Sequence, residues 1–168
     1  YNVLILPQYL LYLSTHFRFS SAFPLTQLVD IMSYEVPTLH SNTSKTQFYN
    51  TEASSIVIYN FHSLYSQDRF FLFTQPSYFN STNDTYSAIS NSLSSVAEVY
   101  PAGNWLEREV AELNGVSFSG KKDLRNLMLQ YGDASTPFKK SFPSIGLKEM
   151  FYDPIKDTIV QNPLSVQL

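Results

Sequence analysis

Residues 103–146, GNWLEREVAELNGVSFSGKKDLRNLMLQYGDASTPFKKSFPSIG, contain the densest charge in the chain and all five of its glycines. Leu106, Val110 and Leu113 recur at the spacing i, i+4, i+7, which places them on one face of a helix. The charged residues among them face mostly away from that stripe: Glu107, Arg108, Glu109 and Glu112. The stretch therefore predicts a helix whose polar side is a docking surface and not a catalytic centre.

Both ends of this predicted helix carry suitable capping residues. Asn104 can accept a hydrogen bond from a free amide of the first turn, so we expect it to be the N-cap. Glu107 and Glu109 lie in the first turns, where the helix dipole favours carboxylates. Asn114-Gly115 closes the helix, because Gly115 can adopt the left-handed conformation without a Cβ clash.

The remainder of the stretch predicts shorter elements. Val116–Phe118 alternates as a short extended segment. Asp123 can cap a second short helix, Asp123–Leu129, which stops at Tyr131-Gly132. The segment Pro137–Pro143 is expected to be extended, because proline pushes its predecessor out of the helical region.

The order of these motifs resembles a known family. Glu107-Arg108-Glu109 is followed by Gly115-Val116-x-Phe118, Asp123-Leu124-Arg125-x-Leu127, Tyr131-Gly132 and Pro137-Phe138-Lys139-Lys140-x-Phe142-Pro143. This order is similar to the signature of the thirty-kilodalton (NuoC-type) subunit of respiratory complex I, the proton-pumping NADH:ubiquinone oxidoreductase. Each motif alone is weakly specific, but their shared order and spacing argue against chance.

The resemblance extends to both sides of the signature. Upstream, Leu28-Val29-Asp30, Val36-Pro37, Tyr59-Asn60 and Ser63-Leu64 are similar to family positions. Downstream, the residues that look like the C-terminal extension of the mitochondrial members are Gly146, Glu149, Tyr152-Asp153 and Pro163. The resemblance thus covers most of the chain from Leu28 to Leu168.

Several positions depart from the family pattern. The family usually has an aromatic residue and an aspartate after Glu-Arg-Glu, where this chain has Ala111-Glu112. A typical His-Pro is Lys121-Lys122 here, and a second arginine is Asn126. The family's Gly-His-Pro is Ser135-Thr136-Pro137. These departures indicate a divergent member whose partner contacts have changed with it.

The resemblance implies a core structural subunit of the peripheral arm, on the matrix side of the mitochondrial inner membrane. It implies that this chain has no active site and binds no cofactor, because FMN, the iron–sulfur clusters, NADH and ubiquinone belong to other subunits. The implied partners are the 49 kDa-type subunit and the PSST-type and TYKY-type iron–sulfur subunits, which the chain would position near the quinone site.

The resemblance also assigns signature and interface positions. Those expected to supply hydrogen bonds and ion pairs are Glu107, Arg108, Glu109, Asp123, Arg125, Lys139 and Lys140. Those expected to supply apolar contacts are Phe118, Pro137, Phe142 and Pro143. The remaining signature positions are Gly115, Leu124, Gly146, Tyr152 and Pro163.

The composition is compatible with a globular domain that meets partners. A chain of 168 residues can form one domain, which buries about 70% of its unfolded surface. Charged residues are 15% of the chain, against about 25% in ordinary soluble domains. Aromatic residues are also 15%, which favours surface hidden in interfaces. Nucleotide bias in an AT-rich mitochondrial genome explains the same composition, and both explanations stay open.

Charge and cysteine usage exclude several classes of protein. The net charge of −3 provides no basic field for nucleic acid or an anionic membrane. Without cysteine, the chain cannot form a disulfide scaffold, a cysteine-ligated zinc site or an iron–sulfur cluster of its own. The longest apolar run, Val3–Leu13, is interrupted by Pro7 and Gln8 and is about half of a membrane span. No targeting peptide is visible, as expected for a mitochondrion-encoded subunit.

The first third of the chain predicts two helices and a strand. Pro7–Leu13 is expected to be a short helix with Pro7 in its first turn. His16–Phe19 alternates and predicts a strand. Pro24–Met32 predicts a helix, because Leu25, Leu28, Val29 and Met32 form a stripe that is more typical of core packing than of a partner groove.

The middle of the chain predicts a β-hairpin between polar loops. Ser55–Tyr65 is the strongest strand, Ser66–Asp68 forms a turn, and Arg69–Thr74 returns as the second strand. Both strands carry apolar residues on both faces, which predicts a central position covered on both sides. The flanking loops are Leu39–Ser54, which resembles an insertion, and Pro76–Asp84, after which a helix begins at Asp84 or Thr85 with Ile89, Leu93 and Val96 on one face.

These elements predict an α+β fold with a mainly antiparallel sheet and packed helices. The predicted organisation is a core at residues 1–132, with an insertion at 39–54, and an extended C-terminal docking tail at 133–168. The segment Phe138–Leu168 has few residues that could form a core alone, so we expect it to lie over a neighbouring subunit.

Other kinds of site find little support. His16, His40 and His62 are too scattered for a ligand cluster, and Glu107 and Glu109 face different directions on the predicted helix. The glycosylation patterns at Asn42, Asn80 and Asn83 would matter only on a secretory route. Alternative functions are the equivalent subunit of a plastoquinone-linked complex or membrane-bound hydrogenase, an independent soluble enzyme, or a secreted binding domain.

Overall fold

A four-stranded sheet forms the centre of the molecule, with strand order β1-β4-β3-β2. The computed structural model describes residues 1–36, 54–76 and 92–165. The four strands are β1 (Asn2–Ile5), β2 (Thr26–Val36), β3 (Ser54–Ser63) and β4 (Arg69–Thr74). β2, β3 and β4 pair antiparallel, whereas β1 pairs parallel with β4. The sheet is mixed but mainly antiparallel, which confirms the predicted α+β class.

The hairpin of β3 and β4 matches the sequence prediction. The two strands are the inner pair of the sheet, as expected for segments rich in β-branched and aromatic residues. One face carries Tyr59, Phe61 and Leu72, which are fully buried. On the other face Ile58, Phe71 and Phe73 are only half-buried. The predicted cover on both faces is therefore only partly right.

Helix α1 (Leu10–Phe19) follows a 3₁₀ turn at Pro7–Tyr9. The helix predicted at Pro7–Leu13 is confirmed, but the strand predicted at His16–Phe19 is wrong because the helix continues through it. Leu10, Ser14 and Phe17 are buried at helical spacing. Phe17 fixes the helix on the sheet through its ring contacts with Phe61 and Phe70, at 5.6 and 5.5 Å between centroids.

Strand β2 replaces the helix predicted at Pro24–Met32, which is wrong. β2 pairs with β3 from Thr26 to Val36, with a register shift between Leu28 and Asp30. This bulge places the buried residues Leu28 and Ile31 three positions apart. A spacing of three is typical of a helix, so the bulge explains the misleading pattern.

Helix α2 (Gly103–Asn114) connects two short parallel strands, β5 (Ser92–Ser94) and β6 (Ser117–Ser119). The helix and the extended segment after it confirm the prediction. The helix predicted from Asp84 or Thr85 is wrong where it can be compared, because Leu93 lies in β5. The rest of it, the adjoining polar loop after Pro76, the loop from Leu39 to Ala53 and the three glycosylation patterns lie outside the described residues; Ser54 begins β3.

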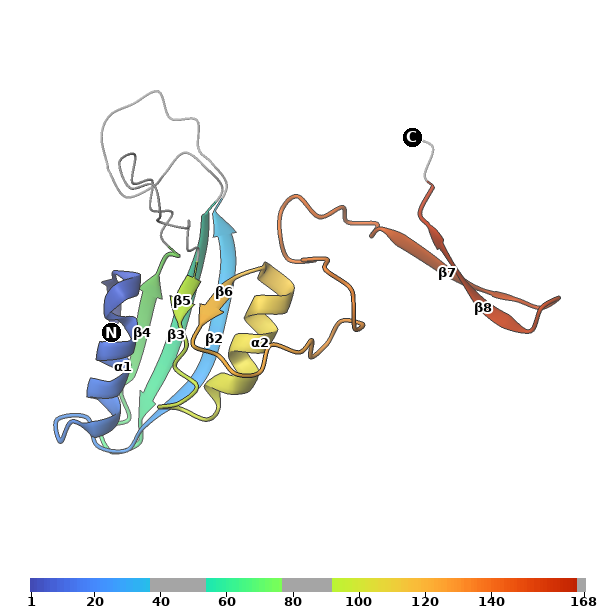
Figure 1. The fold of residues 1–168 in the computed structure, drawn as a ribbon. Coiled ribbons are helices and arrows are strands. Elements are labelled where there is room, and N and C mark those ends of the chain that lie inside the picture. Colours follow the sequence, from blue (N-terminus) through green and yellow to red (C-terminus); the bar gives the residue numbers. More distant parts are fainter. Residues whose placement is uncertain (37–53, 77–91, 166–168) are drawn as a thin grey trace, which may run out of the picture.

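The layer that contains α1, β5, β6 and α2 packs on one face of the sheet (Figure 1). Leu28, Phe61 and Phe70 are cross-strand neighbours and therefore share that face. Phe17 of α1 and Tyr100, just before α2, both contact Phe61. None of the described helices is long and apolar enough to span a membrane.

The segment after β6 departs from two predictions. Asp123–Leu129 forms no helix. Pro137–Pro143 is not extended but follows consecutive turns, in which the amide of Lys139 donates to Thr136 and that of Phe142 donates to Lys139. The chain then forms a separate hairpin of β7 (Lys148–Asp153) and β8 (Thr158–Pro163), which projects from the rest of the molecule (Figure 1).

Candidate functional site

Glu107 of α2 is the most buried charge in the signature stretch. Its side chain has no exposed surface and is 3.0 Å from Lys121 Nζ. The hydroxyl of Ser95 donates to one carboxylate oxygen at 2.6 Å, and the amide of Val96 donates to the other at 2.7 Å. The expectation that Glu107 faces solvent or a partner is therefore wrong.

The βαβ path of the chain brings these partners together. Ser95 and Val96 directly follow β5, Lys121 follows β6, and α2 connects the two strands. Lys121 Nζ also donates to the carbonyl of Asn104 at 2.9 Å. Each member of the buried pair thus has several hydrogen-bond partners, which such a pair needs to offset its desolvation.

The ends of α2 differ in how well the sequence predicts them. Asn104 is not the N-cap: the helix begins at Gly103, Ala102 occupies the cap position, and no side chain caps it. Gly115 ends the helix in the left-handed conformation, with φ of 70°, and its amide donates to Ala111 at 3.0 Å. The C-terminal cap is confirmed.

Arg108 and Glu112 hold the segment after β6 against α2. Arg108 donates to the carbonyls of Arg125 and Asn126 at 2.8 and 3.2 Å, and its guanidinium lies over the Trp105 ring. The carboxylate of Glu112 accepts hydrogen bonds from the amides of residues 127–129. Burial opposes ionisation of Glu112, but these amide donors outweigh it and lower the pKa of the carboxyl. The contacts replace the helix that the sequence predicts here.

Asp123 and Arg125 form an exposed pair at the edge of this segment. Arg125 Nε and Nη2 donate to the two carboxylate oxygens of Asp123 at 3.0 and 2.9 Å. These bonds, together with the Arg125 amide, hold the pKa of Asp123 well below its usual range. Arg108 adds a contact of 3.6 Å to the same carboxylate. The structure therefore gathers four predicted site residues around α2: Glu107, Arg108, Asp123 and Arg125.

The other predicted site residues are spread over several places. Phe118 lies in the core at 6% exposure, so its expected role in a partner contact is wrong. Lys139 lies beside Gly115: a Cβ added at Gly115 would be 3.0 Å from the Cε of Lys139. The amide of Lys140 donates to the Glu35 carboxylate at 2.5 Å. Residues on the surface or partly exposed are Glu109, Leu124, Pro137, Phe142, Pro143 and Gly146, and Tyr152 and Pro163 belong to the projecting hairpin.

Sequence reasoning missed Ser95, Val96 and Lys121 as partners of Glu107. A signal was present, because Gly103, Glu107 and Val110 are spaced i, i+4, i+7 and form the buried stripe of the helix. In the sequence, Lys121 stands out only as a departure from the family pattern. Among the described residues, no group of three or more histidine or acidic side chains could hold a metal ion.

Comparison with known proteins decides the family. Residues 3–148 match the model of the family described as respiratory-chain NADH dehydrogenase, 30 kDa subunit. The chain belongs to this family. The match spans most of the chain, including α2, the segment held by Arg108 and Glu112, and the start of the hairpin, so it confirms the resemblance read from the signature motifs.

Curated relatives of this family member are named as the C subunit of NADH-quinone oxidoreductase. The chain is 44% identical over 72 residues to this protein from Rhodobacter capsulatus, covering 43% of this chain and 36% of the relative. It is 41% identical over 75 residues to the protein of the same name from Azoarcus sp. (strain BH72), which covers 45% of this chain and 37% of that relative. The aligned stretches thus span little more than a third of these relatives.

Two solved structures share the fold of this family member. A trypsin-resistant fragment (1–134) of Nqo5 superimposes with a TM-score of 0.50 and 22% identity, over 73% of this chain and 81% of that chain. A chain of the membrane-bound sulfane sulfur reductase, an archaeal respiratory membrane complex, superimposes with a TM-score of 0.61 and 17% identity. The superposition covers 86% of this chain and 72% of that chain. At these identities the likeness is one of fold alone.

Proposed function

We propose that this chain is a core structural subunit of the peripheral arm of proton-pumping NADH:ubiquinone oxidoreductase. It binds neighbouring subunits and positions those that carry iron–sulfur clusters near the quinone site. Its own charged residues support a structural role, because Glu107, Arg108, Glu112 and Asp123 hold the chain's own backbone and side chains.

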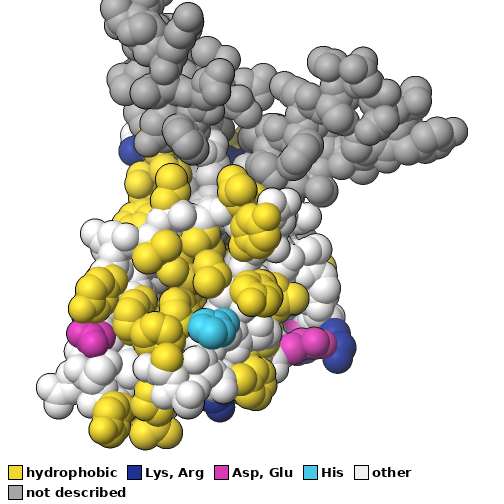
Figure 2. Space-filling model, turned by 90° about the vertical axis from the view of Figure 1, so that its left-hand side faces the viewer, with side chains coloured by type: hydrophobic (Ala, Val, Ile, Leu, Met, Phe, Trp, Pro, Cys, Tyr) yellow, Lys and Arg dark blue, Asp and Glu magenta, His cyan; other side chains and the backbone are white. Residues whose placement is uncertain are grey.

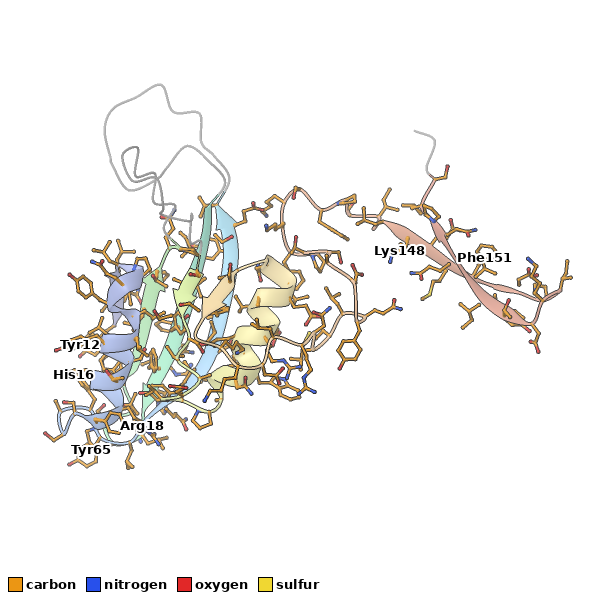
Figure 3. The ribbon with its side chains drawn as sticks, in the orientation of Figure 1. Tyr12, His16, Arg18, Tyr65, Lys148 and Phe151 are labelled. Carbon is orange, nitrogen blue, oxygen red and sulfur yellow. The ribbon has the colours of Figure 1, made fainter. Side chains whose placement is uncertain are left out.

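The observation that carries this proposal is the projecting hairpin of β7 and β8 (Figure 3). Its apolar side chains are exposed, with Met150 at 69%, Tyr152 at 58% and Ile159 at 72%. A lone two-stranded hairpin is only marginally stable in water, so a surface that covers these side chains would stabilise it. We infer that residues 133–168 form a docking tail and that residues 1–132 form the core.

The outer side of α1 is a second surface suited to a partner. Apolar side chains gather on the side of the molecule that carries this helix (Figure 2). Tyr12 is 70% exposed and Phe19 is 80% exposed, and Tyr65 lies nearby at 79% (Figure 3). Exposed apolar surface of this kind is typical of subunits that bury it in an assembly. The two surfaces lie at opposite ends of the molecule (Figure 1), so each can meet a different neighbour.

The proposed partners are the 49 kDa-type subunit and the PSST-type and TYKY-type iron–sulfur subunits. In this proposal the chain binds no cofactor and performs no chemistry, and FMN, the clusters, NADH and ubiquinone belong to other subunits. We place it on the matrix side of the mitochondrial inner membrane. The residues similar to the mitochondrial C-terminal extension support this location, and Tyr152 and Pro163 among them lie on the hairpin.

The decisive experiment is a native gel of detergent-solubilised membranes, stained for NADH oxidation, with the chain located by mass spectrometry. We expect it in a very large band that oxidises NADH. Migration near 19.2 kDa, the mass of the chain alone, would contradict the proposal. Migration in a large band without NADH oxidation would instead indicate the equivalent subunit of a related complex.

Arg125→Ala tests whether the exposed pair with Asp123 contributes to assembly. Arg125 is 72% exposed, so solvent screens the pair and its contribution to folding is small. We expect less assembled complex and nearly unchanged electron transfer per assembled complex. Lys122→Ala is the control, since Lys122 is 89% exposed and, among the described residues, pairs only with the exposed Glu98. Normal assembly with lost electron transfer would indicate direct chemistry at Arg125.

A further inference from the structure

A groove of about 180 Å³ runs between α2 and the edge strand β2. Its base is apolar, because it includes the buried side chains of Ile31, Val110 and Leu113. Met32 and Phe138 line it with exposures of 41% and 61%. Two carboxylates from different elements, Asp30 of β2 and Glu109 of α2, also line it. The groove is thus an apolar slot with acidic groups along it.

Glu109 differs from the other charged residues of α2. Glu107 pairs with Lys121, Arg108 binds the carbonyls of Arg125 and Asn126, and Glu112 accepts three amides. Within the described ranges, Glu109 has neither an ion pair nor a side-chain hydrogen bond. Three of the four charges of the helix therefore stabilise the chain itself, and the fourth lines the groove.

Asp30 and Ser33 leave further hydrogen-bonding capacity in the same place. One oxygen of Asp30 accepts the amide of Ile31 at 2.8 Å, and no cation of residues 1–36, 54–76 or 92–165 pairs with this carboxylate. The hydroxyl of Ser33 also lines the groove and has no hydrogen-bond partner in the described part of the chain. The groove therefore offers the second carboxylate oxygen of Asp30 and the hydroxyl of Ser33 to an incoming donor.

An apolar surface continues from the groove across the sheet. Met32 pairs with Ile58, Ile58 with Phe73, and Phe73 with Leu4, so these residues form one row over all four strands. This row lies on the face opposite to Tyr59 and Phe61, because successive side chains alternate. Leu4 is 70% exposed and Ile58 is half-buried. Met32 belongs to both the groove and this row, so a segment that fills the groove reaches the row around the edge of β2.

We propose that the groove binds a lysine or arginine side chain of a neighbouring subunit, presented from a segment whose adjacent residues are apolar. The aliphatic stem of such a residue packs between Met32 and Phe138. Its charged end donates hydrogen bonds to Glu109 and Asp30, which become its counter-ions. This inference rests on the proposed function, since it requires the chain to assemble with other subunits.

Labelling of single cysteines tests whether the groove is covered in the assembled complex. The chain has no cysteine, so Met32→Cys creates a unique site in the groove. Lys122→Cys, at a side chain that is 89% exposed and belongs to neither the groove nor the α1 surface, is the matched control site. In the isolated full-length chain we expect both to react with a maleimide. In the complex isolated from membranes we expect Met32→Cys to react at least about tenfold more slowly, and equal rates in the two states would overturn the proposal.

Charge variants test whether the occupant is a cation. Glu109→Gln with Asp30→Asn should weaken retention of the chain in the complex about tenfold or more, measured as the fraction remaining after a salt wash. Glu98→Gln, which removes an exposed carboxylate outside the groove, is the control. Glu109→Lys should reduce retention further, because it opposes the incoming cation.

The two tests separate this inference from the proposed function. If wild-type chain is absent from any large complex, the proposed function fails and this inference fails with it. Suppose that the wild type assembles and Met32→Cys is protected, but the Glu109 and Asp30 variants are retained like wild type. The proposed function then stands, and the proposal that the groove binds a lysine or arginine side chain is disproved. Protection together with loss of retention supports the inference.

Discussion

The buried pair of Glu107 and Lys121 joins the ends of the βαβ unit around α2. Lys121→Met removes the cation and leaves the Glu107 carboxylate buried among groups that cannot neutralise it. We expect the free energy of unfolding to fall by about 3–5 kcal/mol, measured by urea denaturation of the isolated chain. The neighbouring substitution Lys122→Met is the control, because Lys122 is 89% exposed and should change stability by less than about 1 kcal/mol.

Two outcomes would contradict this account of the pair. Equal effects of Lys121→Met and Lys122→Met would show that burial of the pair is unimportant. A double variant, Glu107→Leu with Lys121→Met, should lose much less stability than Lys121→Met alone, since no buried charge is left without a partner. Additive losses would show that the two side chains do not interact.

Two buried tyrosines predict how the chain responds to alkali. Burial raises the pKa of Tyr59 well above its usual value, and the nearby Glu107 carboxylate raises it further. Burial also raises the pKa of Tyr100, to about 12, although Arg18 opposes the shift. Because both pKa values are raised on folding, the stability from the neutral phenols is complete below the ordinary tyrosine pKa of about 10. It is lost as the pH rises above that value.

Ultraviolet titration of tyrosinate measures this effect directly. We expect two of the 12 tyrosines, Tyr59 and Tyr100, to ionise only as the chain unfolds. The double variant Tyr59→Phe with Tyr100→Phe should abolish the delayed part of the titration and leave the rest unchanged. A single titration step that includes all tyrosines in the wild type would contradict the prediction.

The candidate site shows what residue-level patterns can and cannot predict. The cap at Gly115 follows from the sequence, because a left-handed helix cap depends mainly on local backbone conformation. The burial of Glu107 cannot be predicted from the sequence, since a glutamate in a charged stretch is normally exposed. Its partners Ser95 and Lys121 come from the ends of two different strands. Only the tertiary fold brings them together, so the local sequence could not specify the pair.

At the scale of elements, Gly115 connects the end of α2 to the tail. An alanine there would adopt an unfavourable left-handed φ, and its Cβ would lie 3.0 Å from both Lys139 Cε and Thr136 Cγ2. Gly120 also has a positive φ, but no atom of the described part of the chain lies within 4 Å of an added Cβ. Gly120→Ala should therefore cost only the conformational strain, about 1–2 kcal/mol.

We expect Gly115→Ala to lower the thermal midpoint of unfolding more than Gly120→Ala does. The additional loss reflects the displacement of residues 136–139 from the end of α2. Accelerated proteolysis at Lys139 or Lys140 in Gly115→Ala, but not in Gly120→Ala, would confirm that the tail has moved. Identical midpoints for the two variants would show that the contact with Lys139 and Thr136 has no energetic effect.

The elements differ in how well the sequence specifies them. The β3–β4 hairpin is predictable with nearly correct bounds, because its β-branched and aromatic residues favour strands regardless of context. β2 resembles a helix in the sequence because a bulge changes the spacing of Leu28 and Ile31. The helix expected at Asp123–Leu129 does not form. Instead, the amides of residues 127–129 donate hydrogen bonds to the carboxylate of Glu112, which lies outside this segment in α2.

At the scale of the whole molecule, the hairpin of β7 and β8 contributes little to the core. Its residues are mostly exposed and its two strands pair with each other. A chain that ends after Gly146 should therefore keep the unfolding midpoint of the full-length chain. We expect the same truncation to reduce strongly the amount of chain recovered in the large complex.

A single substitution tests whether an exposed apolar side chain of the hairpin contributes to assembly when the hairpin itself is kept. Ile155 is 93% exposed in the turn between β7 and β8. Ile155→Ser leaves the strands intact and removes one apolar contact, so we expect a smaller loss of assembly than with the truncation. A truncated chain that unfolds at a lower midpoint would show that the hairpin stabilises the core, contrary to this prediction.

The parallel pairing of β1 with β4 has a consequence for how the chain folds during its synthesis. Asn2 lies opposite Phe71 and Ile5 opposite Thr74, so these contacts join residues far apart in the sequence. The first strand leaves the ribosome long before its partner exists, and its apolar residues remain exposed until Thr74 has emerged. Since loops of this length close slowly, we expect β1 to join the sheet after the β3–β4 hairpin has formed. β1 is therefore exposed to chaperones and to aggregation for longer than β2, β3 or β4, each of which pairs with a neighbour in sequence.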